Sequence, residues 1–128
     1  MLARAGHAVT LIGRAPHVQA IGSRGLQLHR GGQVETVRLA ASTDLAAVQG
    51  ADLVLFCVKS TDTDAVARAI APLLGARALV LSLQNGVDNT ATMARHIRQP
   101  VVPVVVYVAT AMPGPGVVQH FGRGDLVI

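Results

Sequence analysis

The sequence predicts an α/β fold with a mostly parallel sheet and helices on both faces. Short apolar runs rich in Val, Leu and Ile alternate with segments of helical apolar period. The run at 51–59 is almost continuously apolar, as is typical of strands buried on both faces of a parallel sheet. Alternating strands and helices predict parallel pairing through right-handed crossovers. With 128 residues, 51% of them hydrophobic, the chain can form one domain with a real core, so we expect a single domain over 1–128.

In the first half of the chain, turn residues separate the expected elements. Gly6 and Gly50 are natural helix ends, and Gly31-Gly32 is a hairpin signal between two alternating runs. Ser42, Thr43 and Asp44 are N-cap candidates for the segment after that hairpin. The expected elements are the end of a helix at 1–5, a buried strand at 8–13, a connection with a short helix at 14–25, a hairpin at 26–39 and a helix at 42–50.

The second half repeats the strand-helix pattern and then becomes all strand. We expect Pro72 to kink the end of one helix and Pro103 to mark a bend or an edge strand. Cys57 lies within an apolar run, which favours a small buried core residue. The expected elements are strands at 51–59, 78–86 and 100–112, helices at 60–75 and 88–97, a turn at 113–116 and a hairpin at 117–128.

Charge and motif content exclude several classes of function. The net charge is +4, but the ten arginines are scattered singly without aromatic residues among them, so we expect no nucleic-acid partner. The apolar runs are far shorter than the roughly 20 residues of a membrane span, and the N-terminus has no signal-peptide pattern. The five histidines show no metal-ligand spacing and no pairing with a carboxylate for a catalytic triad. We expect a cytoplasmic protein with no metal site.

Polar side chains follow three of the expected strands, at the points where those strands end. Arg14 follows the first, Lys59 (the single lysine) follows the strand at 51–59, and Asn85 follows the strand at 78–86. Ligands of parallel α/β sheets bind beyond the carboxyl ends of the strands, so we expect these residues to gather on one rim. In a dinucleotide-binding fold, an arginine at the end of the second strand suits the 2′-phosphate of NADPH, and Arg14 would have this role if the strand at 8–13 corresponds to that second strand.

Each of these residues also has a purely structural interpretation. Arg14 taken alone is explained as a surface arginine, and Lys59 equally as a lysine extending from a strand edge to solvent. Lys59 as a functional group would meet a phosphate, a carboxylate or a carbonyl that gains negative charge. Asn85-Gly86 taken alone favours a plain turn, although the Asn85 amide offers a donor and an acceptor to a substrate hydroxyl or a nicotinamide ribose.

Four segments in order resemble the ketopantoate reductase family. They are "RAGHAVTLIGR", "DLVLFCVKSTDTDAVARAIAPLL", "LSLQNGVDN" and "GVVQHFGRGDLVI". The resemblance implies a Rossmann-like domain of an NADPH-dependent enzyme that reduces 2-dehydropantoate, a small-molecule 2-oxo acid, to (R)-pantoate. It implies that Arg14 binds the 2′-phosphate, Lys59 contacts the cofactor, Asn85 binds cofactor and substrate, and the backbone of Ala111 lies against the cofactor.

The family pattern also contains parts that residues 1–128 do not match. Its first strand and Gly-rich loop, and its helical C-terminal domain with the catalytic lysine, have no counterpart here. We therefore expect an N-terminally truncated, partial dinucleotide-binding domain with no catalytic residue in this chain, inactive by itself. A central strand missing from the sheet would leave open edges, through which the chain could form a homo-oligomer.

Two other functions stay open at this point. The chain could be a non-catalytic nucleotide-binding or interaction module that pairs an open sheet edge with a partner. It could also belong to a reductase of another 2-oxo acid, such as a 2-hydroxyacid or 6-phosphogluconate-type enzyme, although "QNG" and "GRGDLVI" favour the ketopantoate reductase interpretation.

Overall fold

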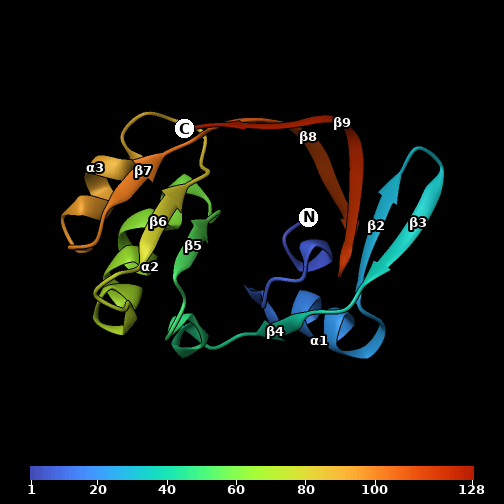
Figure 1. Cartoon of the computed structure of the whole chain (residues 1–128), viewed down its shortest axis with the longest axis horizontal. Coiled ribbons are helices and arrows are strands. Elements are labelled where there is room, and N and C mark those ends of the chain that lie inside the picture. Colours follow the sequence, from blue (N-terminus) through green and yellow to red (C-terminus); the bar gives the residue numbers. More distant parts are fainter. The chain divides into compact units, whose positions relative to one another are not determined.

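The computed structural model describes residues 1–128 and confirms the α/β class (Figure 1). The chain forms two compact units, one of Met1–Ala47 with Val108–Gly124 and one of Val48–Tyr107 with Asp125–Ile128. Parallel strand pairs occur in three separate sheets: a two-stranded sheet in the first unit, a three-stranded sheet in the second, and a mixed four-stranded sheet. Each unit is described by itself below. No helix in the structure has both the length and the apolar character that a membrane span requires.

A small parallel sheet and one helix form the start of the first unit. The 3-10 helix Ala3–Ala5 ends at Gly6, which has a φ of 88°, as its glycine predicts. Strand β1 (Thr10–Ile12) pairs in parallel with β4 (Ala40–Ser42), and helix α1 (Ala15–Arg24) packs against β4. The sequence did not indicate β4, because two of its three residues are alanines.

A mixed sheet has the strand order β3-β2-β9-β8 and belongs to the first unit except for residues 105–107 and 125–127 at two strand ends. The predicted hairpin is present as β2 (Leu26–Arg30) and β3 (Gln33–Val37). The hairpin predicted within 117–128 is wrong, because these residues form one strand, β9 (Val117–Val127), beside β8 (Val105–Gly114). The Pro115-Gly116 pair makes the reversal after β8, and residues 117–120 at the start of β9 pair in parallel with β2.

Gly25 joins α1 to β2 in a conformation that other residues rarely adopt. Its φ is +82°, and an added Cβ would lie 2.8 Å from the Thr36 Cγ2 atom. We expect Gly25→Ala to lower the free energy of unfolding by about 1–3 kcal/mol, because both the backbone and the neighbouring side chain must shift. Urea unfolding followed by far-UV circular dichroism measures the change.

Gly22 provides the matched control within the same helix. A Cβ at Gly22 meets no atom within 4 Å, and its backbone is helical. Gly22→Ala should therefore raise the free energy of unfolding by about 0.5–1 kcal/mol. Equal effects of the two substitutions would contradict the strain assigned to Gly25.

A three-stranded parallel sheet and two helices form the second unit. The strands are β5 (Leu53–Phe56), β6 (Leu79–Ser82) and β7 (Val101–Pro103), in that order across the sheet. The helices are α2 (Thr63–Ile70) and α3 (Asn89–Ala94). Buried side chains of the sheet, the two helices and the segment after α3 form one core: Phe56, Ala67, Ile70, Val80, Met93 and Ile97. Pro103 ends the edge strand β7, in agreement with the prediction.

Proline and polar residues shorten the helices that the pattern predicts. The helix expected at 60–75 is a 3-10 turn (Ser60–Asp62), α2, and a second 3-10 turn (Ala71–Leu73) that contains Pro72. The helix expected at 42–50 is a single 3-10 turn, Leu45–Val48. Of its three cap candidates, Asp44 accepts the Ala46 amide hydrogen at 2.8 Å through Oδ1.

The two faces of the β5-β6 sheet differ in burial. Val80 and Phe56 are 0% and 3% exposed, whereas Leu53 and Leu55 on the opposite face are 42% and 39% exposed. The prediction that 51–59 is buried on both faces is therefore wrong for that opposite face. Cys57 follows Leu55 in the strand alternation, and its exposure corrects the prediction of a buried core cysteine.

Candidate functional site

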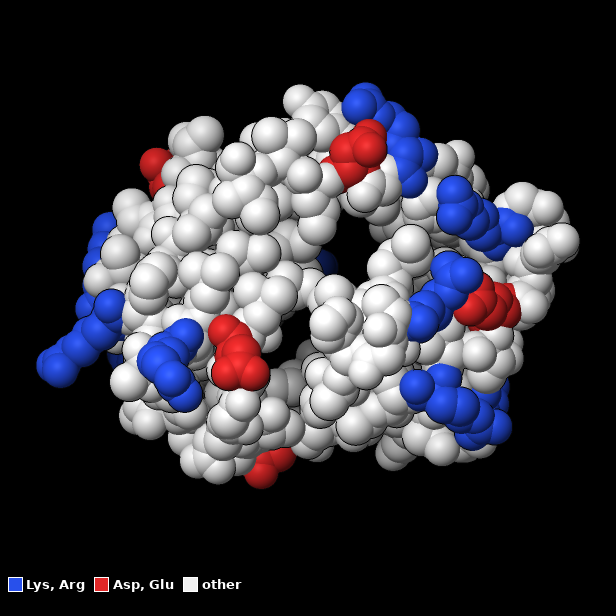
Figure 2. Space-filling view, viewed as in Figure 1, with Lys and Arg blue, Asp and Glu red and all other residues white.

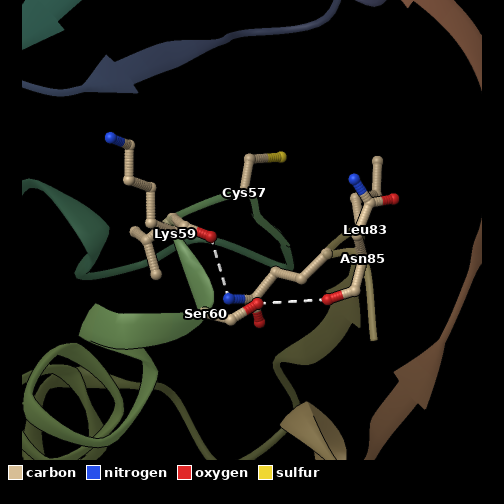
Figure 3. A pocket seen from close by; sticks show the side chains of 7 residues that line it. Cys57, Lys59, Ser60, Leu83 and Asn85 are labelled. Carbon is tan, nitrogen blue, oxygen red and sulfur yellow. Dashed lines mark hydrogen bonds between the residues drawn. The ribbon is translucent and has the colours of Figure 1, made fainter. Parts of the chain in front are cut away.

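The carboxyl ends of β5 and β6 enclose a pocket of about 330 Å³ in the second unit (Figure 3). Seven residues line it: Cys57, Val58, Lys59, Ser60, Leu83, Gln84 and Asn85. Two of the predicted site residues are thus brought together, since neighbouring parallel strands end at the same edge of a sheet. The Lys59 ammonium is the one charged group among the lining side chains, so the pocket favours an anionic ligand.

Three polar side chains point to the same side of this pocket. Figure 3 shows the Lys59 ammonium, the Cys57 thiol and the Asn85 amide all directed away from Ser60. Ser60 Oγ donates a hydrogen bond of 3.1 Å to the Asn85 carbonyl oxygen and so links the two strand-end loops. An ammonium donor and an amide with donor and acceptor atoms fit the phosphates, ribose and carboxamide of a nicotinamide cofactor.

Gln84 holds the base of the pocket with all of its side-chain hydrogen-bonding groups. Its Nε2 donates to the Val58 carbonyl oxygen at 2.8 Å and to Thr63 Oγ1 at 2.7 Å. Its Oε1 accepts from Ser82 Oγ at 3.3 Å. One side chain therefore connects the residue before Lys59, the start of α2 and the end of β6.

Thr63 and Asn89 extend this network to the start of α3. Thr63 Oγ1 donates to Asn89 Oδ1 at 3.2 Å, and Asn89 Nδ2 donates to the Asn85 carbonyl oxygen at 2.9 Å. The two side chains are 2% and 8% exposed. The sequence analysis assigned no role to Gln84, Thr63 or Asn89. The feature that could have indicated one is that these polar residues lie near the ends of predicted buried strands.

Arg14 and Ala111 belong to the first unit. Arg14 directly follows the β1 strand end and is the N-cap residue of α1, with an exposed side chain. The amide of Gly13 donates to the Ser42 carbonyl oxygen at 3.0 Å, which fixes the backbone just before Arg14. Ala111 is exposed on β8. The assignment of these two residues to the cofactor stays a prediction.

Two further titratable features differ from the sequence-based expectation. Partial burial raises the pKa of the Cys57 thiol, although the residue is exposed. His96 Nε2 lies 2.8 Å from Asp64 Oδ1 and thus forms a histidine–carboxylate pair that the sequence did not indicate. The hydrogen bond from His96 lowers the pKa of Asp64. This pair joins α2 to the residues after α3 and is not among the residues that line the pocket.

Neither the charges on the face drawn in Figure 2 nor metal ligands indicate another kind of site. Basic side chains on the face drawn in Figure 2 are separated by acidic and uncharged residues. The structure contains no group of three or more His, Cys, Asp or Glu side chains that could hold a metal ion. The pocket at the ends of β5 and β6 is therefore the candidate ligand site.

Comparison with known proteins decides the family. The sequence model described as "Ketopantoate reductase PanE/ApbA" matches residues 1–128. The chain belongs to the ketopantoate reductase family. Among curated members of this family, the 2-dehydropantoate 2-reductase of Halobacterium salinarum is 39% identical over 133 residues, which is 100% of this chain and 43% of that protein. The enzyme of the same name from Pyrococcus horikoshii is 32% identical over 128 residues, covering 100% and 41%.

Solved structures of a ketopantoate reductase family member and of a D-mandelate dehydrogenase agree with this fold. A family member from Ralstonia eutropha JMP134 has a TM-score of 0.94 and 59% identity, over 98% of this chain and 42% of that one. A D-mandelate dehydrogenase solved with NADH and anilino(oxo)acetate has a TM-score of 0.83 and 26% identity, over 98% and 41%. This chain thus spans less than half the length of the relatives it matches.

Proposed function

We propose that residues 1–128 are part of the dinucleotide-binding domain of an NADPH-dependent 2-dehydropantoate 2-reductase that works in the cytoplasm. The pocket at the ends of β5 and β6 carries this proposal, because a single cation, Lys59, and the Asn85 amide both line it, at the edge of a parallel sheet where ligands of α/β folds bind. Family membership and the relatives named 2-dehydropantoate 2-reductase support the reaction. The cofactor supplies the hydride that reduces the 2-oxo group.

The residues of this chain bind and orient in the proposed reaction. Lys59 neutralises negative charge on the cofactor, and the Asn85 amide holds the cofactor ribose and the substrate. Arg14 binds the 2′-phosphate, and the backbone of Ala111 lies against the cofactor. By the family resemblance, the proton for the new alkoxide comes from a lysine of a helical domain outside residues 1–128.

A second candidate is an NADH-dependent reductase of a bulkier 2-oxo acid. The similarity to the D-mandelate dehydrogenase solved with NADH favours it, at 26% identity. The two candidates give Arg14 different roles. Its guanidinium binds the 2′-phosphate of NADPH in the first, whereas NADH in the second has no 2′-phosphate for it to bind.

We expect Arg14→Ala to reduce the preference for NADPH over NADH about tenfold, the equivalent of a charge-assisted hydrogen bond of about 1.5 kcal/mol. Dissociation constants for both cofactors, measured by fluorescence titration of the full-length gene product, test this. The affinity for NADH should stay within about twofold, because NADH makes no use of the lost charge.

Arg30→Ala is the control, since Arg30 is an exposed arginine at the end of β2 in the same unit. It should leave the preference unchanged. A wild-type protein that binds NADH as tightly as NADPH would contradict the Arg14 assignment and favour the second candidate. Turnover of 2-dehydropantoate against an aromatic 2-oxo acid then distinguishes the substrates.

A further inference from the structure

We infer that Gln84 is a positioning residue that sets the spacing between Lys59 and Asn85 and thereby controls cofactor affinity. The inference rests on the proposed function, in which these two residues bind the cofactor. Gln84 itself lines the base of the pocket and acts through its neighbours. Its backbone leads directly into Asn85, while its side chain bonds the carbonyl of Val58, which directly precedes Lys59.

The geometry makes Gln84 a crosslink with no spare donor. Both Nε2 hydrogens are used, at 2.8 Å to Val58 and at 2.7 Å to Thr63. The donor distances are short for neutral groups, which indicates well-formed bonds. Asn of shorter reach cannot span the same partners, and an apolar side chain would leave the Val58 carbonyl and the Thr63 hydroxyl without this donor.

Burial makes this crosslink hard for water to replace. Thr63 is 2% exposed and Ser82 is 4% exposed, so two of the three groups that Gln84 bonds are buried, while Val58 is half-buried. If position 84 carries an acceptor in place of the amide donor, that acceptor competes for the Thr63 hydroxyl hydrogen with its present acceptor, Asn89 Oδ1. The change would then reach Asn85, whose carbonyl oxygen accepts from Asn89.

Gln99 gives a matched control in the same unit. Its Nε2, like that of Gln84, donates two hydrogen bonds, here to the carbonyl oxygens of Leu74 at 3.3 Å and Gly75 at 3.1 Å. These partners precede β6, at the end of the strand opposite to the pocket. Gln99→Glu therefore removes an equivalent pair of side-chain donors without touching the pocket-lining residues.

The test compares Gln84→Glu with Gln99→Glu in the full-length gene product. A carboxylate at position 84 keeps the length of glutamine but can only accept hydrogen bonds. We expect the dissociation constant for NADPH to rise at least tenfold at pH 7.5 in Gln84→Glu and to change less than twofold in Gln99→Glu. Thermal unfolding of both variants measures how much of each effect is general destabilisation.

The pH profile separates positioning from a merely structural role. A protonated carboxyl at position 84 regains one donor, so the affinity of Gln84→Glu should recover as the pH falls through the pKa of the new carboxyl. Lys59 and Cys57 are the other titratable groups of the pocket, and the wild-type profile provides their baseline. The inference fails if the profile of Gln84→Glu follows that of the wild type.

A readout without cofactor separates failure of the inference from failure of the proposed function. The alkylation rate of Cys57 by a small maleimide, measured by mass spectrometry of its peptide, reports on the β5 loop directly. We expect Gln84→Glu to change this rate at least threefold and Gln99→Glu to leave it unchanged. Absence of NADPH and NADH binding by the wild type would overturn the proposed function, while an unchanged Cys57 rate would overturn the role of Gln84.

Gln84→Met keeps the inference testable if the carboxylate variant does not fold. Methionine has a similar length, carries no charge and donates no hydrogen bond. It should raise the dissociation constant for NADPH and change the Cys57 rate in the same way, without the pH recovery. Wild-type values for both quantities in Gln84→Met would overturn the inference.

Discussion

Replacing Lys59 with methionine should raise the dissociation constant for NADPH by ~10–150-fold, the equivalent of ~1.5–3 kcal/mol for one charge-assisted hydrogen bond. Methionine approximates the length and apolar stem of lysine and removes only its charge. Lys59 is the one cation among the residues that line the pocket, so no other lining side chain can take over this charge. Fluorescence titration of the full-length gene product at two salt concentrations measures the loss.

Arg77 is the matched control for this charge removal. Arg77 is exposed in the segment before β6, at the end of the sheet opposite to the pocket. Arg77→Met makes the same change in net charge and should leave the dissociation constant within about twofold, since exposed charges beyond ~10 Å are screened at 0.1 M salt. Equal weakening by the two substitutions would show that Lys59 acts only through the overall charge of the protein.

Phe56→Ala should lower the free energy of unfolding of the second unit by about 3–5 kcal/mol. Phe56 is 3% exposed at the end of β5, on the sheet face that also contains the fully buried Val80. Its removal leaves a cavity that surrounding strands and helices can fill only in part. Urea unfolding followed by far-UV circular dichroism measures the change.

Phe121 offers the comparison within the same chain. Phe121 lies on β9 and is 67% exposed. Phe121→Ala removes the same atoms from a position in contact with solvent and should change the free energy of unfolding by less than about 0.5 kcal/mol. A large loss at Phe121 with a small loss at Phe56 would contradict the core described for the second unit.

The elements that the sequence predicted well are those with a strong local signal. The apolar runs before Lys59 and Asn85 indicated β5 and β6, and two glycines indicated the β2-β3 hairpin. Strand β4 was missed, because Ala40–Ser42 becomes a strand through its pairing with β1 and not through its own residues. The error at 117–128 is also one of long-range pairing, since the first residues of β9 lie beside β2 and not beside a later part of the same segment.

The candidate site divides in the same way between local and long-range information. It was predictable that Lys59 and Asn85 line the same pocket, because adjacent parallel strands end at one edge of the sheet. The role of Gln84 was not predictable, since it depends on which side chains its amide reaches after the strands have paired. Cys57 was predicted as buried because a continuous apolar run does not reveal which strand face a helix covers.

The pairing of β2 with β9 has a consequence for the order in which the chain can fold. Gln27 lies beside Val117, so the two strands come from positions 90 residues apart. Closing so long a loop costs chain entropy before the strands make stabilising contacts. The loops between β5, β6 and β7 are much shorter, because these strands follow each other closely along the chain. During synthesis, the outer edge of β2 therefore stays unpaired until residues 117–120 have left the ribosome, and this nascent edge is where a chaperone or a wrong strand can bind.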